Sequence, residues 1–150
     1  MEAVVRPKPN PALKRLAKLI GTWEMKGRTY DSKHDNVSGH VAIRWFSGGF
    51  FMVQEGEVES KGFKVHGLEV VGYDSSTRTF PANVYSDMSE SPSKYYWDVR
   101  GDSVKHWTKG AKYTGRFSDD GKTLSGGWRP TGRGRKSSGN AYDVVMTRVE

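Results

Sequence analysis

Hydrophobic and polar positions follow two different periods along the chain, and the change falls at Gly21. Before it, apolar residues recur at the i, i+3, i+4 and i+7 spacing of an amphipathic helix, at Leu13, Leu16, Ala17 and Ile20. Asn10 and Pro11 supply an N-cap and a proline at the first helical position, and Gly21 is a fitting stop. The pattern predicts one short helix after a disordered lead-in at residues 1–9. Its apolar face is short and has no aromatic anchor, which favours a cover over one end of a sheet structure above a membrane-surface helix.

After Gly21 apolar and polar residues alternate, which is the period of β-strands. The alternation predicts ten strands, at residues 22–30, 40–46, 50–57, 63–73, 79–86, 95–100, 104–109, 113–117, 123–129 and 142–149. Turn sequences separate them, including Ser-Gly-Gly at 47–49 and Asp-Asp-Gly at 119–121. Pro81 suggests a strand start, a bulge or an edge.

Ten sequential antiparallel strands would leave two exposed edges in an open sheet, and closure into a barrel removes both. The expected fold is therefore all-β: an antiparallel up-and-down β-barrel with one short N-terminal helix, forming a single domain over residues 10–150. A β-sandwich is the alternative. A barrel of this strand number is wider than its own side chains fill easily, so we expect an internal ligand cavity.

Composition agrees with one β-rich domain. The chain has 150 residues with 12% aromatic residues and 18 glycines, which suits many strands and turns. It has no cysteine, which excludes disulfides, thiolate metal sites and a cysteine nucleophile. We find no apolar run long enough to span a membrane and no secretory signal, so a cytoplasmic protein is expected.

The formal net charge of +7 raises the question of nucleic-acid binding. Most of the excess is concentrated in residues 1–18 and 121–142, and the rest of the chain is close to neutral. A nucleic-acid groove normally spreads Lys and Arg along its binding face, so neither a nucleic-acid nor a membrane partner is expected. The basic loop at 129–136 is interpreted as a solvated loop, with a clasp for an anionic ligand or lipid as the alternative.

Four runs of sequence resemble known barrels. Gly-Thr-Trp at 21–23, after a short helix, resembles the opening motif of lipocalins and fatty-acid-binding proteins, together called calycins. The runs at 44–55, 67–74 and 118–124 together resemble a bacterial domain-of-unknown-function family of lipocalin-like barrels, of the DUF1579 type. The resemblance covers roughly residues 12–149. It implies a closed or nearly closed barrel with an internal pocket, and no agreed activity.

A related group, the nitrobindin-like haem barrels, opens with a similar Gly-x-Trp stretch and uses a histidine near the C-terminus as its iron ligand. The last histidine here is His106, so nothing after it can supply that ligand. The histidines also lack H-x-x-x-H and H-x-H spacing. We therefore expect no cofactor and no metal.

Polar residues within strands are the candidates for acid–base chemistry. They are His66, Glu69, Glu55, Arg44 and His106. His66 and Glu69 fall on opposite faces of one predicted strand, and neither face is cleanly apolar, so the pattern leaves open which one faces inward. Either Gln54 or Glu55 must face inward, and Arg44 could pair with Glu55 on the surface or as a buried anchor.

Large apolar side chains on many strands either build the core or line a cavity. The candidate ligand-binding residues are Trp23, Trp45, Phe50, Met52, Tyr73, Tyr85, Tyr96, Trp97, Trp107, Tyr113 and Trp128. We find neither a nucleophile elbow nor a phosphate loop. The sequence therefore favours a protein that binds an apolar or aromatic small molecule. The alternative is a cyclase-, isomerase- or hydratase-type enzyme that uses the same cavity. Aromatic residues on an outward face could also form a homodimer surface.

Overall fold

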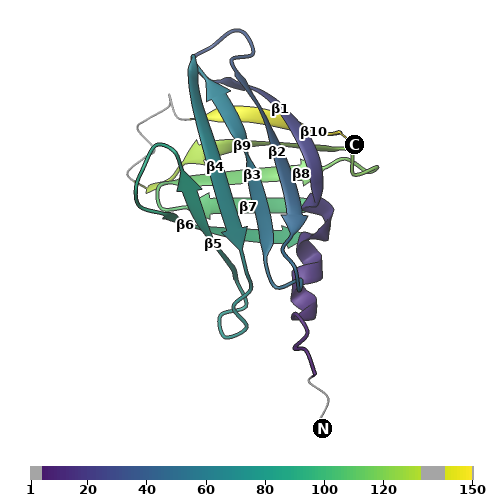
Figure 1. Cartoon of the computed structure of the whole chain (residues 1–150). Helices are drawn as coiled ribbons and strands as arrows, with labels where there is room; N and C mark the ends of the chain where they lie inside the picture. The colour runs from purple at the N-terminus through teal and green to yellow at the C-terminus, as the bar shows by residue number, and fades with distance from the viewer. Residues whose placement is uncertain (1–4, 133–140, 150) are drawn as a thin grey trace.

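The computed structural model describes residues 5–132 and 141–149, and its ten antiparallel strands form one closed barrel (Figure 1). The strands are β1 (Gly21–Thr29), β2 (Val37–Trp45), β3 (Met52–Ser60), β4 (Phe63–Val71), β5 (Phe80–Ser86), β6 (Ser93–Arg100), β7 (Ser103–Thr108), β8 (Ala111–Phe117), β9 (Thr123–Pro130) and β10 (Tyr142–Val149). Each pairs with its neighbour in the chain, and β1 also pairs with β10, with Met25 opposite Met146. The predicted barrel and its strand number are confirmed.

The N-terminal helix η1 (Pro11–Leu19) is a 3-10 helix, with Asn10 as its N-cap. Its buried residues are Leu13, Leu16 and Leu19, spaced by three. A 3-10 helix has three residues per turn, so this spacing keeps all three leucines on one side. The expected apolar stripe was wrong at Ala17, which is exposed because the helix does not follow the α-helical period, whereas Ile20 is partly buried and packs against the core.

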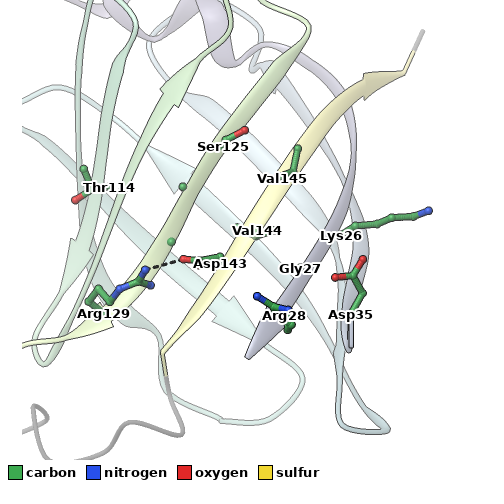
Figure 2. A pocket seen from close by; sticks show the side chains of 12 residues that line it. Lys26, Gly27, Arg28, Asp35, Thr114, Ser125, Arg129, Asp143, Val144 and Val145 are labelled. Carbon is green, nitrogen blue, oxygen red and sulfur yellow. Dashed lines mark hydrogen bonds and ion pairs between the residues drawn. The ribbon is translucent and has the colours of Figure 1, made fainter. Parts of the chain in front are cut away.

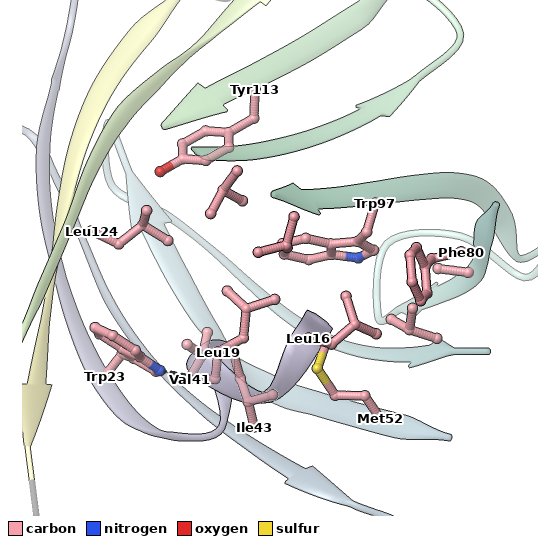
Figure 3. Close-up of a cluster of buried hydrophobic side chains, with 14 of the residues drawn as sticks. Leu16, Leu19, Trp23, Val41, Ile43, Met52, Phe80, Trp97, Tyr113 and Leu124 are labelled. Atoms are coloured by element: carbon pink, nitrogen blue, oxygen red, sulfur yellow. Dashed lines mark hydrogen bonds between the residues drawn. The ribbon is translucent and has the colours of Figure 1, made fainter. Parts of the chain in front are cut away.

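The helix covers the end of the barrel where β1 begins and β2 ends (Figure 1). Leu16 and Leu19 are fully buried in the core cluster drawn in Figure 3. The Trp23 indole donates to the Leu19 carbonyl at 2.9 Å, and Arg148 Nη2 donates to the Lys18 carbonyl at 2.8 Å. These bonds hold the carboxyl end of the helix against β1 and β10.

The other side of η1 is held by two ion pairs. Arg15 pairs with Asp98 on β6, and Lys18 Nζ lies 2.8 Å from Asp102 in the β6–β7 turn. Both pairs are partly exposed and each contributes little alone. Their positions show that η1, near the start of the chain, is held against strands from the middle of the chain. Across the described ranges 5–132 and 141–149, no helix has the length and apolar character needed to cross a bilayer.

The strand phases that the sequence left open are clear in the structure. On β4, Glu69 is 3% exposed and faces inward, whereas His66 faces outward. On β3, Gln54 lines interior space and Glu55 contacts His66 on the outer face. Pro81 is the second residue of β5, and its carbonyl accepts from the Gly72 amide at 3.0 Å. It marks a strand start, not an edge.

Candidate functional site

An interior pocket of about 180 Å³ lies within the barrel, which we call the central pocket. Its lining is mostly apolar and aromatic, and consists of Leu19, Met25, Val41, Ile43, Gln54, Val58, Trp97, His106, Tyr113, Leu124, Trp128, Tyr142, Val144 and Met146. An adjoining pocket of about 150 Å³ shares Val41, Gln54 and Val58 with it and is also lined by Glu69. For comparison, an apolar cavity of about 150 Å³ holds one benzene molecule.

Two buried polar side chains meet beside the central pocket. His106 Nε2 lies 2.9 Å from Glu69 Oε2, and the Trp97 indole donates to the same oxygen at 2.8 Å. Glu69 is 3% exposed and His106 8% exposed. Burying these groups is costly unless they bond one another, so the contact explains how an apolar interior tolerates them. We call these two residues the Glu69–His106 pair.

Aromatic rings fix the orientation of His106. The Trp97 indole stacks on its imidazole with centroids 3.7 Å apart and planes 15° apart. The Trp128 ring meets the imidazole edge-on at 5.2 Å, and Tyr95 lies at 5.1 Å. An imidazole held on several sides has little freedom to rotate, so the two ring nitrogens keep distinct surroundings.

The hydrogen bonds assign a role to each ring nitrogen. A carboxylate accepts hydrogen bonds, so we assign the proton of this contact to His106 Nε2. Nδ1 has no hydrogen-bond partner among residues 5–132 and 141–149, and His106 lines the central pocket. A carboxylate behind one nitrogen of an imidazole fixes the tautomer and the orientation of the ring. The arrangement can accept a hydrogen bond from a bound molecule, or a proton.

Three tyrosines surround the same region. Burial and the neighbouring Tyr95 raise the pKa of Tyr142 to about 12, and burial holds the pKa of Tyr113 well above its usual range. Burial, and then the charge of Glu69, also raise the pKa of Tyr95. All three phenols are therefore neutral at physiological pH.

Tyr113 lies flat over two glycines of the barrel wall. A Cβ at Gly115 would lie 2.7 Å from Tyr113 Cζ, and one at Gly126 would lie 2.8 Å from the same atom. The Tyr113 hydroxyl is buried and has no hydrogen-bond partner within the described part of the chain. Figure 3 shows this hydroxyl pointing from β8 toward the side of the barrel that holds Leu124. The two glycines thus make the room in which the ring lies.

The structure separates the five candidate acid–base residues into two groups. It brings Glu69 and His106 together in the interior. It puts Glu55 and His66 on the outer face, 3.4 Å apart, where Glu55 and then Glu57 raise the pKa of His66. Arg44 is exposed, and Glu55 lies opposite Ala42 and Leu68 in the ladders. The Arg44–Glu55 pair considered from the sequence is not among the ion pairs of the described residues.

The eleven candidate ligand-binding residues lie in four places. Trp97, Tyr113 and Trp128 line the central pocket. Trp23, Trp45, Met52 and Tyr73 belong to the core cluster or pack against it, and Phe50 lies in the β2–β3 connection. Tyr85, Tyr96 and Trp107 are on the outer face, where Tyr96 stacks on Trp107 at 5.8 Å. The last three take no part in the site proposed below.

Several pocket residues were not in the sequence-based set. Met25 and Met146 face each other across β1 and β10, and Tyr142 and Gln54 also line the pocket. Strand phase carried the signal, because residues two apart on a strand share a face. Met25 lies on the same face as the buried Trp23, and Tyr142 and Met146 lie on the same face as the buried Val144. The sequence-based set held ten aromatic residues and Met52, and gave too little weight to the other methionines.

A larger depression, of about 780 Å³, lies on the outside of the barrel over β1, β10, β9 and β8 (Figure 2). It is open to solvent and its charges are mixed, with Lys26 and Arg28 near Asp35, and Arg129 paired with Asp143 at 2.6 Å. It contains no buried polar group comparable to the Glu69–His106 pair, so the central pocket is the better candidate. Half of the basic loop at 129–136, residues 133–136, lies outside the described residues.

Within the described ranges, no group of three or more His, Asp or Glu side chains is arranged to hold a metal ion. The fold and pocket define the protein as a closed antiparallel β-barrel with one end covered by a helix. The chain belongs to the DUF1579 family, a family of proteins of unknown function, whose model matches residues 8–125.

Among solved structures, the chain is similar to the crystal structure of Rv2717c from M. tuberculosis. The two share 15% sequence identity with a TM-score of 0.62, over 95% of this chain and 100% of that one. At this identity the likeness shows a common fold and nothing about activity. A comparison with curated proteins finds no match.

Proposed function

We propose that this barrel binds a small apolar or aromatic molecule in the central pocket. The observation that carries the proposal is an interior space of about 180 Å³ walled by aromatic, aliphatic and methionine side chains. Pockets of this kind, apolar with a few convergent polar groups, are the usual sites for small molecules. The volume suits one substituted aromatic ring, since about 150 Å³ accommodates benzene.

Met146 and Val145 provide a matched pair of variants that tests this site. Met146 faces the pocket, whereas Val145 is the next residue of β10 and is 43% exposed on the outer face. Met146→Trp fills the pocket, and Val145→Trp adds the same side chain to the outside. With toluene as the probe, we expect Met146→Trp to weaken binding at least about tenfold and Val145→Trp to leave it unchanged.

Calorimetric titration of the wild type and both variants measures these affinities, with circular dichroism to verify folding. Equal toluene affinity in all three proteins would contradict the pocket as the site. Absence of toluene binding to the wild type would contradict the proposed class of ligand.

A second function, acid–base catalysis on the bound molecule, is favoured by the Glu69–His106 pair alone. A histidine with a carboxylate behind it is the common form of a general base. Catalysis of the cyclase, isomerase or hydratase type requires a base beside an oriented substrate and leaves little trace in the sequence.

Hydrogen–deuterium exchange at the methyl group of acetophenone tests this second function. His106 Nδ1 would remove a methyl proton to give the enolate, and a deuteron from solvent would return to the carbon. We expect wild-type protein to accelerate the exchange and Glu69→Gln to lose at least about tenfold of that acceleration. NMR in D₂O follows the exchange. Equal exchange rates with wild type and variant would contradict catalysis and leave binding as the only function.

A further inference from the structure

We propose that the molecule held in the central pocket carries a hydrogen-bond donor, a phenolic or enolic hydroxyl or a ring N–H, and that His106 Nδ1 accepts it. Glu69 is the positioning residue behind the imidazole. This inference rests on the proposed binding function and specifies the chemistry of its ligand.

The direction of the hydrogen bond follows from the partners of His106. Glu69 Oε2 accepts from the Trp97 indole at 2.8 Å and lies 2.9 Å from His106 Nε2, and we assign the proton between them to Nε2 because a carboxylate accepts. With its proton on Nε2, a neutral imidazole has one lone pair left, on Nδ1. That nitrogen makes no hydrogen bond within the described ranges, and the His106 side chain, which is 10% exposed, lines the pocket. A ligand donor would complete its hydrogen bonding.

The rigidity of the ring makes this acceptor selective. Stacking on Trp97 at 3.7 Å and edge contact with Trp128 at 5.2 Å restrain the imidazole, so it cannot turn to present an N–H instead. A site built to bond a polar hydrogen rejects an isosteric molecule that lacks one, because the buried acceptor is then left unpaired. Phenol and toluene are such isosteres, and each is small enough for the pocket.

The test compares the two isosteres in two variants. The first is the double variant His106→Phe/Glu69→Gln. It keeps a flat ring beside Trp97 and an amide oxygen that accepts from the Trp97 indole, and it removes the buried carboxylate. His66→Phe makes the same histidine exchange on the outer face and is the control. We expect the double variant to bind phenol about tenfold more weakly than the wild type while its toluene affinity stays within about threefold, and the control to change neither affinity.

A measurement on the wild type needs no variant. In protein with nitrogen-15-labelled histidine, phenol should shift the Nδ1 resonance of His106 in the direction of hydrogen-bond acceptance, and toluene should leave it in place. Phenol binding that is equal in wild type and double variant would overturn the inference. So would a His106 ring with protons on both nitrogens, because its Nδ1 would then donate.

The outcomes separate this inference from the proposed function. If toluene binds in the pocket but phenol gains nothing from His106, the binding function stands and the donor preference falls. If the wild type binds neither molecule, both fall together.

Discussion

The imidazole of His106 on β7 lies 2.9 Å from the carboxylate of Glu69 on β4, across 37 positions of sequence. Two other strands, β5 and β6, separate β4 from β7 in the barrel wall. The contact fixes one polar side chain in a mostly apolar interior, and the site proposed here depends on it.

We expect the protein to be less stable when one member of the Glu69–His106 pair is replaced than when both are replaced. Removing one partner leaves the other buried without its hydrogen bond, which costs about 1–3 kcal/mol and more for a charged group. We expect His106→Leu to lower the free energy of unfolding by about 3 kcal/mol, and the addition of Glu69→Gln to restore at least half of that loss. Urea unfolding measures both. A double variant less stable than His106→Leu alone would contradict the coupling.

The phenol of Tyr142 makes a pH-dependent contribution at alkaline pH. Burial raises its pKa to about 12, whereas an unfolded tyrosine titrates near pH 10. Between these values the unfolded chain releases a proton that the folded chain keeps, so stability falls as pH rises from about 10 to about 12. The shift corresponds to roughly 2–3 kcal/mol.

Tyr142→Phe should therefore unfold with a shallower dependence on pH above about pH 10 than the wild type. Tyr113, whose pKa is raised in the same direction, supplies the slope that remains. Urea unfolding at several alkaline pH values provides the comparison, and identical slopes for the two proteins would argue against a raised Tyr142 pKa.

Gly115 should tolerate no side chain while Tyr113 is present. Its added Cβ would lie 2.7 Å from Tyr113 Cζ and 2.8 Å from Cε1. We expect Gly115→Ala to destabilise the protein by about 1–3 kcal/mol, and Tyr113→Leu to relieve most of that cost in the double variant. Gly67 is the control, because a Cβ there meets only the Tyr85 carbonyl at 3.5 Å. Thermal unfolding of the wild type, the two single variants, the double variant and Gly67→Ala measures these effects. A clash unrelated to Tyr113 would leave the effects of Gly115→Ala and Tyr113→Leu additive.

His66 should titrate above the ordinary histidine pKa of about 6.5, because Glu55 and then Glu57 raise its pKa. Its contribution to stability is present below that value and is lost as pH rises through the raised folded pKa. Glu55→Gln should lower the midpoint measured by NMR titration. A midpoint that does not move would show that Glu55 has no effect on His66 in solution.

Strand phase accounts for much of what the sequence could predict. Alternation assigned Val65, Gly67, Glu69 and Val71 to one face of β4, and burial identifies that face as the interior. Alternation alone could not show which face of β4 is the inner one. The inner face carries the polar Glu69 and the outer face the polar His66, so the two faces look equally polar in the sequence. The helix type was mistaken for a related reason: Leu13 and Leu16 fit both helical periods, and only the burial of Leu19 separates them.

The meeting of Glu69 and His106 could not be read from either strand. In the ladders Glu69 lies opposite Val84, Val84 lies opposite Ser93, and His106 lies opposite Trp97, four residues farther along β6. The two side chains therefore meet diagonally, through the tilt of strands that closure of a barrel imposes. That stagger is a property of the whole sheet and leaves no local signal.

The most direct test of small-molecule binding in the central pocket is an isotope-filtered nuclear Overhauser experiment with toluene and methyl-labelled protein. We predict contacts from the toluene ring to the methyl groups of Met25 and Met146, which face each other inside the barrel, and none to Val145 on the outer face. Contacts to Val145 without contacts to either methionine, or no contacts at saturating toluene, would contradict the account.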